Sequence, residues 1–321
     1  MVVKEAVSIA AFFLAACSMT AFAQDRFPSK PIHIIIPFAA GSSPDVWSRL
    51  MAKQLEPRIG QPIVVEIKPG ANSTLGATLV AKSAPDGYTI LYSTNSATSA
   101  AKALFKSLSY DPIRDFAALT IFQQAYFAFM VRPEEKGTTF AQFLDKMRKD
   151  PGRYPTAGSS STHEILDRMM DKASGKIGHT YVRYANSGTM MTDVVGGRLG
   201  GAFHTISGSL PFMKSGQAHA IAVSSPVPLA GMLETPLMIT TLPGVALGPW
   251  SGLFVPAKTP RNVINALYQP IAAILKEPAF VRWSEEAGRA ITMTPEEANN
   301  FVREEEGRWT SLGRMAGIDP E

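Results

Sequence analysis

The sequence predicts an α/β protein made of two wound, mostly parallel sheets with flanking helices. Short apolar, β-branched runs at residues 32–36, 63–67 and 88–92 alternate with helical segments, a pattern typical of a parallel sheet covered by helices. The same alternation returns after a small polar loop at residues 156–161. A length of 321 residues is enough for two domains of ordinary size.

The first predicted strand leads into a loop of small residues and then into a helix. Residues 39–43 have little side-chain bulk, so a ligand could approach the backbone closely. Ser43 is the predicted N-cap and Pro44 the first helical residue, while Asp45 in the first turn is expected to stabilise the helix dipole and order the loop. Free amides at a helix start favour an anion. A plain strand-to-helix connection without a ligand remains the alternative for this stretch.

The third predicted strand ends in polar residues. A tight turn at residues 85–87 precedes this strand, and Thr94 and Asn95 follow it closely. Ligands of open α/β sheets bind at the carboxyl ends of the strands. These two side chains are therefore candidates for the binding site.

The second unit also places a small polar loop before a helix. Ser161 with Glu164 three residues later predicts a capping box at the start of a helix over residues 162–173. The other predicted elements are a helix at 74–84, strands at 118–122 and 126–131, a helix at 139–148, a strand at 180–184, a helix at 190–195, strands at 201–205 and 218–224, a return strand at 251–255, and proline-initiated helices at 260–275, 278–287 and 295–315. They place the first domain at residues 24–124 and 248–321 and the second at 125–247, with the first crossing near residues 123–125.

The N-terminus is predicted to be a signal peptide, residues 1–23. Lys4 precedes an apolar run, and the Ala21-Phe22-Ala23 pattern suits cleavage before Gln24, so we expect a periplasmic protein. A lipoprotein cleaved before Cys17 and anchored there is the alternative. Cys17 is the single cysteine, which excludes an internal disulfide and a cysteine nucleophile from the mature chain.

Charge and motif content exclude several function classes. The net charge is +4, with no basic cluster, so nucleic acid is not an expected partner. The Gly158-Ser159-Ser160-Ser161 stretch lacks the second glycine of a nucleophile elbow, and no HxxxH or HExxH pattern occurs. We therefore expect no catalytic residue, no metal and no cofactor. His163 is expected to be a neutral packing histidine, whereas His204 could equally face the ligand or not.

Several ordered motifs together resemble the solute-binding proteins of tripartite tricarboxylate transporters, the TctC or Bug family. The motifs, in chain order, are Phe-Pro-Ser-Lys-Pro-Ile from residue 27, Pro-Phe-Ala-Ala-Gly from 37, Pro-Gly-Ala from 69, Ala-Pro-Asp-Gly-Tyr-Thr from 84, Tyr-Asp-Pro from 110, Pro-Gly from 243 and Trp-Ser-Gly-Leu-Phe-Val-Pro from 250. The resemblance implies a type II periplasmic-binding-protein fold, a hinged trap of two discontinuous domains. It also implies that loops 38–43 and 158–162 hold a ligand carboxylate through backbone groups and water.

The chain departs from this family at positions that bear on the ligand. It has Gly41-Ser42 where two glycines are usual, Tyr184-Ala185-Asn186 where Tyr-Lys-Gly is usual, and His204 where an acidic residue is common. These departures leave the carboxylate grip in place and the identity of the ligand open. Among the aromatic residues, only Phe38 and Tyr184 are expected to line the site.

These observations lead to one expected function. The protein should be a monomeric, non-catalytic solute-binding protein that delivers a small carboxylate (a di- or tricarboxylate, an amino-acid-like acid or an aromatic acid) to the membrane subunits of a tripartite transporter. A periplasmic sensor subunit that hands the ligand to a signalling receptor is the alternative, and a hydrolase is a third. The predicted ligand-binding residues are Phe38, Ala39, Ala40, Gly41, Ser42, Ser43, Thr94, Asn95, Gly158, Ser159, Ser160, Ser161, Thr162, Tyr184 and His204.

Overall fold

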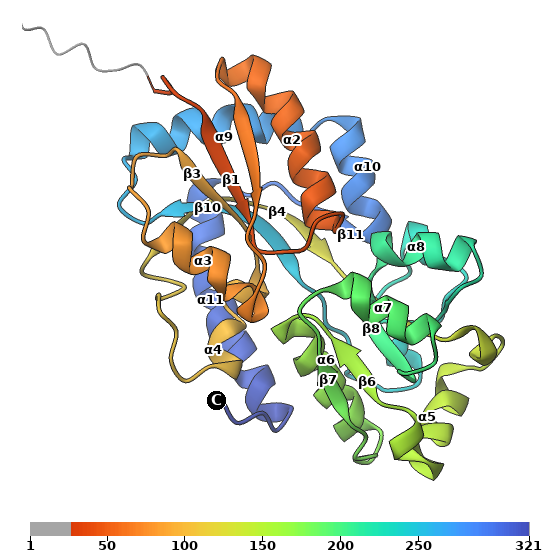
Figure 1. Cartoon of the computed structure of the whole chain (residues 1–321). Helices are drawn as coiled ribbons and strands as arrows, with labels where there is room; N and C mark the ends of the chain where they lie inside the picture. Colours follow the sequence, from red (N-terminus) through yellow and green to blue (C-terminus); the bar gives the residue numbers. More distant parts are fainter. Residues whose placement is uncertain (1–26, 321) are drawn as a thin grey trace, which may run out of the picture.

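The computed structural model describes residues 27–320 and has two lobes, each built on one sheet (Figure 1). The predicted signal peptide and Cys17 lie outside the described residues. The first sheet has the order β11-β4-β10-β3-β1-β2 and the second β7-β6-β8-β5-β9. The strands are β1 (Ile32–Ile36), β2 (Ile63–Ile67), β3 (Thr89–Thr94), β4 (Phe116–Ala125), β5 (Phe127–Val131), β6 (Thr156–Gly158), β7 (Tyr181–Arg183), β8 (Gly201–Thr205), β9 (His219–Val223), β10 (Trp250–Pro256) and β11 (Gly288–Ala290).

Helices flank both sheets. They are α2 (Ser43–Ile59), α3 (Thr74–Ala81), α4 (Ala101–Leu104), α5 (Phe140–Lys149), α6 (Ser161–Ala173), α7 (Ser187–Val195), α8 (Ile206–Lys214), α9 (Arg261–Leu275), α10 (Pro278–Ala287) and α11 (Pro295–Met315). Six short 3-10 turns, among them η2 (Asn95–Ala97), complete the described chain. Among residues 27–320, no helix is both long and apolar enough to cross a membrane.

The α/β class with two units is confirmed, but both sheets are mixed and not mostly parallel. β1 pairs in parallel with β2 and β3, whereas β10 runs antiparallel to β3 and β4. In the second sheet β6 pairs in parallel with β7 and β8, and β5 is antiparallel to its neighbours. The antiparallel pairings involve the strands beside the crossings, because a chain that leaves a sheet and returns enters it from the opposite direction.

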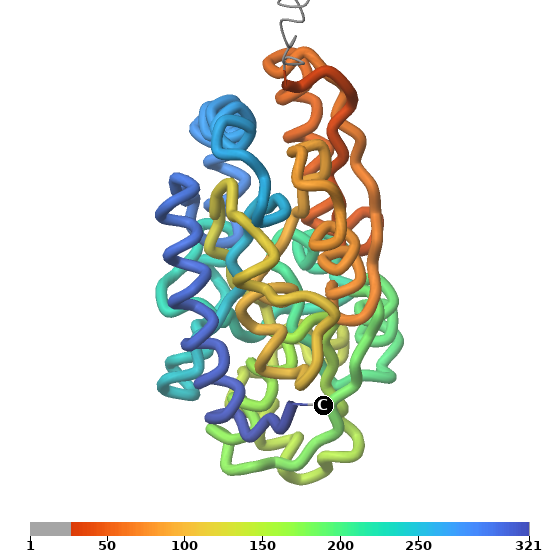
Figure 2. Tube along the Cα trace, turned by 90° about the vertical axis from the view of Figure 1, so that its left-hand side faces the viewer, coloured from red at the N-terminus to blue at the C-terminus, as the bar shows by residue number. Residues whose placement is uncertain are grey.

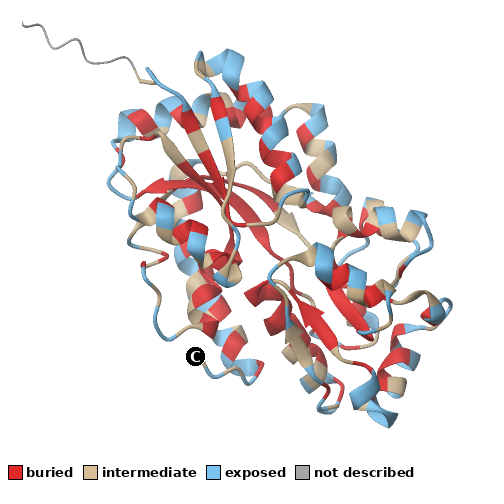
Figure 3. Cartoon of the chain, in the orientation of Figure 1, coloured by how far each residue is buried: buried red, intermediate tan, exposed pale blue. Residues whose placement is uncertain are grey.

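Each lobe has its own apolar core, visible as the buried inner faces in Figure 3. In the first lobe Trp47 of α2 stacks on Phe122 of β4, with 4.0 Å between ring centroids. In the second lobe Phe129 contacts Phe203 edge to face at 5.0 Å. Burying aromatic rings of this size contributes much of the stability of a domain.

The two lobes are joined by more than the strand crossings. The chain leaves the first sheet at Ala125, enters the second at Phe127 and returns at Trp250. Helix α11, which begins against the first sheet, runs down toward the second lobe (Figure 2) and contacts α6. Its fully buried Trp309 belongs to the apolar core of the second lobe. The predicted division at residues 124–125 and 247–248 stays a prediction, because α11 serves both lobes.

The sequence missed helix α8 (Ile206–Lys214) entirely. This segment contains Gly208 and Pro211, two residues that disfavour a helix interior. Its packing against β5, β8 and β9 outweighs that local preference. The omission matters because α8 supplies one wall of the cavity described next.

Candidate ligand-binding cavity between the lobes

A cavity of about 550 Å³ lies between the two lobes and is lined by both. The first lobe contributes residues 38–44, the end of β3, and residues from β4, β10 and α10. The second lobe contributes the loop before α6 and the starts of α7 and α8. A volume of this size suits a small organic ligand.

Four helix starts meet at this cavity. The N-cap residues of α2, α6, α7 and α8, which are Ser42, Ser160, Asn186 and Thr205, all line it. Each helix start carries free backbone amides and the positive end of a dipole. The sequence predicted two such starts. The structure adds α7 and α8, so partial positive charge converges from both lobes.

No charged side chain lines the cavity among the described residues. The nearby Asp45 is committed to its own loop, as predicted, because its carboxylate accepts a hydrogen bond from the Gly41 amide at 2.8 Å and pairs with Arg49 at 2.7 Å. The Gly41 amide is therefore not free to bind a ligand. The backbone of Gly41 has a φ of +75°, the left-handed region that favours glycine.

His163 lines the cavity as a neutral donor. The Ser159 amide donates to His163 Nδ1 at 3.1 Å, so the proton of the neutral ring is on Nε2. Burial, reinforced by His204, lowers the pKa of His163 to about 3. Its Nε2 is buried and has no partner among the described residues. The predicted neutral form is supported, but the ring lies at the cavity and is not only a packing group.

His204 also lines the cavity and has the opposite tautomer. Ser209 donates its only hydroxyl proton to the Thr205 carbonyl at 2.9 Å, so its oxygen must accept from His204 Nδ1 at 3.1 Å. Burial lowers the pKa of His204 to about 4, which leaves a bare acceptor at Nε2.

The starts of α2 and α6 differ by one residue from the prediction. Helix α2 begins at Ser43 with Ser42 as N-cap, and no side chain caps it. Helix α6 has Ser160 as N-cap, accepting from the His163 amide at 3.4 Å. The predicted capping box of Ser161 with Glu164 is wrong, because the Glu164 carboxylate instead pairs with Arg183 at 2.7 Å.

Ten of the predicted ligand-binding residues line the cavity, and ligand contact by each stays a prediction. They come from the loop before α2, the end of β3, the loop before α6 and the end of β8. These residues are Phe38, Ala39, Ala40, Gly41, Ser42, Ser43, Thr94, Ser159, Ser160 and His204.

The other five do not line this cavity. Asn95 donates to Thr162 Oγ1 at 2.7 Å, and Ser161 donates to the Ser96 carbonyl at 3.2 Å, so these buried groups join the lobes. Gly158 is a packing position, since a Cβ there would lie 2.3 Å from His163 Cβ. Tyr184 borders a smaller adjacent hollow and donates to Asp193 at 2.6 Å. These five residues make structural contacts here, and ligand contact by them stays a prediction.

Sequence reasoning missed several cavity residues. Gln123 is a buried polar residue inside an apolar strand, a signal that was available, and its amide donates to the Ser284 carbonyl at 3.1 Å. Tyr126 was expected to lie in the core, and Trp283 was not considered. Ser207 and Phe212 were missed because α8 was not predicted.

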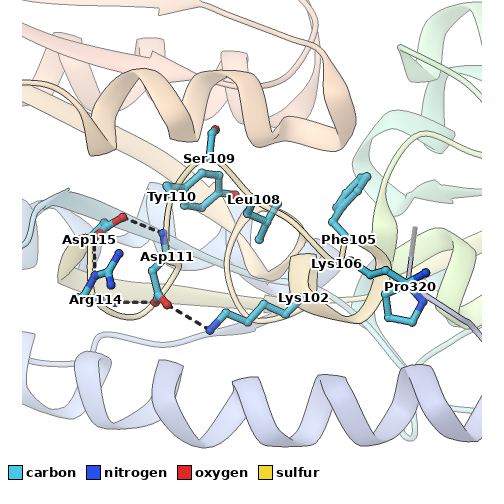
Figure 4. A pocket seen from close by; sticks show the side chains of 10 residues that line it. All are labelled: Lys102, Phe105, Lys106, Leu108, Ser109, Tyr110, Asp111, Arg114, Asp115 and Pro320. Atoms are coloured by element: carbon cyan, nitrogen blue, oxygen red, sulfur yellow. Dashed lines mark hydrogen bonds and ion pairs between the residues drawn. The ribbon is translucent and has the colours of Figure 1, made fainter.

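A second hollow of about 550 Å³ lies on the outer surface beside α4 and is lined by Lys102, Lys106, Asp111, Arg114 and Asp115, among others (Figure 4). Two of its three cationic side chains are already paired, Lys102 with Asp111 and Glu306 and Arg114 with Asp115, while Lys106 has no ion pair among the described residues. It is a weaker candidate for an anion site. The described residues also contain no cluster of histidine and acidic groups suited to a metal.

Comparison with known proteins gives a consistent result. The family model of the tripartite tricarboxylate transporter family receptor, TctC, matches residues 47–318. A UPF0065 protein of Bordetella bronchiseptica is 29% identical over 308 residues, covering 96% of this chain and 92% of that protein. BugT of Bordetella pertussis is 26% identical over 318 residues, 97% of each chain. The solved structure of the periplasmic binding protein BugD, at 25% identity, has a TM-score of 0.85 and covers 92% of this chain and 100% of its own.

Proposed function

The chain belongs to the TctC family of tripartite tricarboxylate transporter receptors, and from this premise we propose that it captures a small carboxylate between its lobes and delivers it to transporter membrane subunits. The observation that carries this proposal is the convergence of four helix N-termini on a cavity without charged side chains. Such a site stabilises a negative charge through backbone dipoles and needs no cationic side chain.

The available donors are sufficient for ordinary binding-protein affinity. A hydrogen bond to a charged group contributes about 1.5–3 kcal/mol net. Three or four of them account for much of the roughly −8 kcal/mol of a micromolar ligand, before the entropy of association is subtracted. Ser42 Oγ and His163 Nε2 are both buried without a partner among residues 27–320, and each is such a donor.

The arrangement of the lobes supports a hinged trap. Contacts such as Ser207 Oγ to Ser43 Oγ at 3.0 Å cross between the lobes at the cavity and can break when it opens. We propose that the protein is a periplasmic monomer released by cleavage of residues 1–23, with lipidation at Cys17 as the alternative. Intact mass of the exported protein distinguishes a start at Gln24 from a diacylglyceryl-modified start at Cys17.

A hydrolase is not favoured by the histidines of the cavity. Among the described residues, Ser209 is the serine whose hydroxyl is bonded to a histidine ring nitrogen, that of His204. Ser209 is fully buried, does not line the cavity and donates its proton to a carbonyl. It therefore lacks the exposed nucleophile and the directed proton transfer that acyl-transfer catalysis needs. No observation favours the sensor role over transport, and deletion of the transporter genes separates these two by its effect on uptake.

A thermal-shift screen of mono-, di- and tricarboxylates on the mature protein tests the proposal. We expect at least one class to raise the melting temperature with saturation, and small-angle scattering to show compaction at saturation. Absence of any carboxylate response, or turnover of the ligand, would contradict the proposed function.

A further inference from the structure

The two cavity histidines offer complementary hydrogen-bonding atoms to a ligand. Their Nδ1 atoms are used by the protein in opposite ways, since His163 Nδ1 accepts from the Ser159 amide and His204 Nδ1 donates to Ser209. Each ring is at least nine-tenths buried. In the neutral form His163 therefore presents an N–H donor at Nε2, and His204 presents a lone pair at Nε2.

The described residues provide no partner for either Nε2 atom. His163 Nε2 is fully enclosed without a hydrogen bond, and His204 Nε2 makes none. A polar atom that is buried without a partner destabilises the protein, and this applies to His163 Nε2. A ligand that accepts from His163 Nε2 would remove that penalty, and one that donates to His204 Nε2 would give this atom a partner.

The charge of the cavity restricts what else the ligand can carry. With no Asp or Glu in the lining over residues 27–320, a ligand ammonium would be buried without a counter-charge. With no Lys or Arg, a second carboxylate would depend on helix dipoles alone. Burying an unpaired charge is far more costly than burying a hydroxyl that finds a hydrogen-bond partner.

Aromatic rings surround the two histidines. Phe127 lies 4.3 Å from the His163 ring, and Phe212 lies 6.3 Å from the His204 ring, centroid to centroid. Both rings also line the cavity, as do Phe38, Tyr126 and Trp283. This surface favours an apolar body between the polar ends of the ligand.

Resting on the proposed function, we propose that the ligand is a monocarboxylate with an apolar body and a neutral hydroxyl. The helix starts hold the carboxylate, a small shift of the His163 ring on binding brings its Nε2–H to the same carboxylate, and His204 Nε2 accepts from the hydroxyl. His204 is thus the residue that determines specificity for the hydroxyl, and the absence of charged side chains from the lining selects against amino acids and against di- and tricarboxylates.

Calorimetry on the mature protein tests this with matched acids. The aromatic set is benzoate, its three hydroxybenzoate isomers, 4-methoxybenzoate and terephthalate. The aliphatic set is hexanoate, 6-hydroxyhexanoate, 6-aminohexanoate and adipate. In at least one set we expect a hydroxylated monoacid to bind about tenfold or more tightly than its parent, and the dicarboxylate to bind more weakly than either. In the aliphatic set the amino acid should also bind more weakly than either. A methoxy group lacks the proton and should confer no gain.

Two substitutions assign the hydroxyl preference to His204. His204→Gln can place an amide oxygen near the former Nε2 and should retain the preference. His204→Phe removes the acceptor, and the hydroxylated acid should fall about tenfold, to the affinity of its parent. Both variants lose the bond to Ser209, so each is a control for the other, and the ratio of the affinities for the hydroxylated and parent acids is compared within each variant.

The outcomes separate this inference from the function on which it rests. If adipate, terephthalate or another polycarboxylate binds most tightly, if no hydroxylated monoacid exceeds its parent, or if His204→Phe keeps the preference, the inference is wrong while a carboxylate-binding function stands. If no carboxylate of any class binds, the proposed function itself fails.

Discussion

Two hollows of similar volume offer opposite chemistry to an anion. The groove beside α4 has two lysines and an arginine, and neighbouring carboxylates pair with Lys102 and Arg114 but not with the solvent-facing Lys106 (Figure 4). The cavity between the lobes has no charged lining among the described residues, yet four helix starts line it. Two donors without a partner, Ser42 Oγ and His163 Nε2, are buried in its walls. The comparison teaches that unsatisfied donors, and not formal charge, mark a site for a buried carboxylate.

The largest expected effect is the loss of ligand affinity when a side chain is added to the backbone at the cavity, compared with the same change at a similar backbone position elsewhere. Gly41 and Gly137 have φ values of +75° and +80°, and a Cβ at either meets nothing within 4 Å. Valine at each position should therefore introduce similar backbone strain, on the order of 1–2 kcal/mol in unfolding free energy. Only Gly41→Val adds a side chain at the cavity, so we expect about a hundredfold loss of affinity there and none for Gly137→Val. If calorimetry gave the two variants equal affinities for the ligand, the backbone at Gly41 would have no special role in binding.

The second effect is on stability as a function of pH. The pKa of His163 is about 3 in the folded protein, below the unfolded value of about 6.5, so above pH 6.5 both states are neutral and the group contributes no pH dependence. As pH falls below 6.5, the unfolded state alone takes up the proton and stability declines. By pH 5 this amounts to about 2 kcal/mol.

His163→Phe should remove that loss, which urea unfolding at pH 7, 6 and 5 would measure. His179 is the opposite control, because burial lowers its pKa but the neighbouring carboxylates of Asp167 and Asp171 raise it by more, so that the pKa lies above the ordinary value. That residue adds stability below its unfolded pKa, and the contribution disappears as pH rises through its folded pKa. His179→Phe should therefore steepen the decline toward pH 5. Parallel pH profiles for wild type and His163→Phe would contradict the neutral, buried state of that ring.

A smaller effect separates ligand contact from helix capping. Ser42 Oγ is buried without a described partner, whereas Ser160 Oγ caps α6. We expect Ser42→Ala and Ser160→Ala each to weaken binding about tenfold, and Ser160→Ala also to lose about 1 kcal/mol of stability. Thr139→Ala, which removes the capping box of α5 away from the cavity, should show the stability loss alone. Unchanged affinity in both serine variants would show that these hydroxyls do not bind the carboxylate.

The smallest effect belongs to the surface groove. Lys102→Ala breaks partly exposed ion pairs with Asp111 and Glu306, and such pairs contribute about 0–1 kcal/mol. Affinity for the carboxylate should stay within twofold of wild type. A tenfold loss of affinity, measured by calorimetry, would indicate that the anion binds in the groove and not in the cavity.

The sequence predicted more of the fold than of the site. Strong local signals located β1 and the proline-initiated helices, because apolar runs and helix-start residues act over a few positions. Pairing direction was harder, since the antiparallel entry of β10 depends on where the chain crosses between lobes. For the site, the loops before α2 and α6 were recognisable from small and capping residues.

Other parts of the site depend on tertiary contacts. The wall formed by α8 was invisible because Gly208 and Pro211 argue locally against a helix. The tautomers of His163 and His204 follow from a backbone amide and from Ser209, respectively, and no spacing in the sequence reveals the resulting donor and acceptor. Asn95 and Thr162 were correctly found to lie near strand and helix ends, but only the folded structure shows that they bind each other.

The most direct test of the central claim is the ratio of dissociation constants for a bound acid and its primary amide, measured by calorimetry at pH 7. The two molecules have nearly the same shape, but only the acid carries the charge that the helix starts stabilise. We predict that the acid binds at least a hundredfold more tightly, about 2.7 kcal/mol. Equal binding of acid and amide would contradict a site organised around a carboxylate.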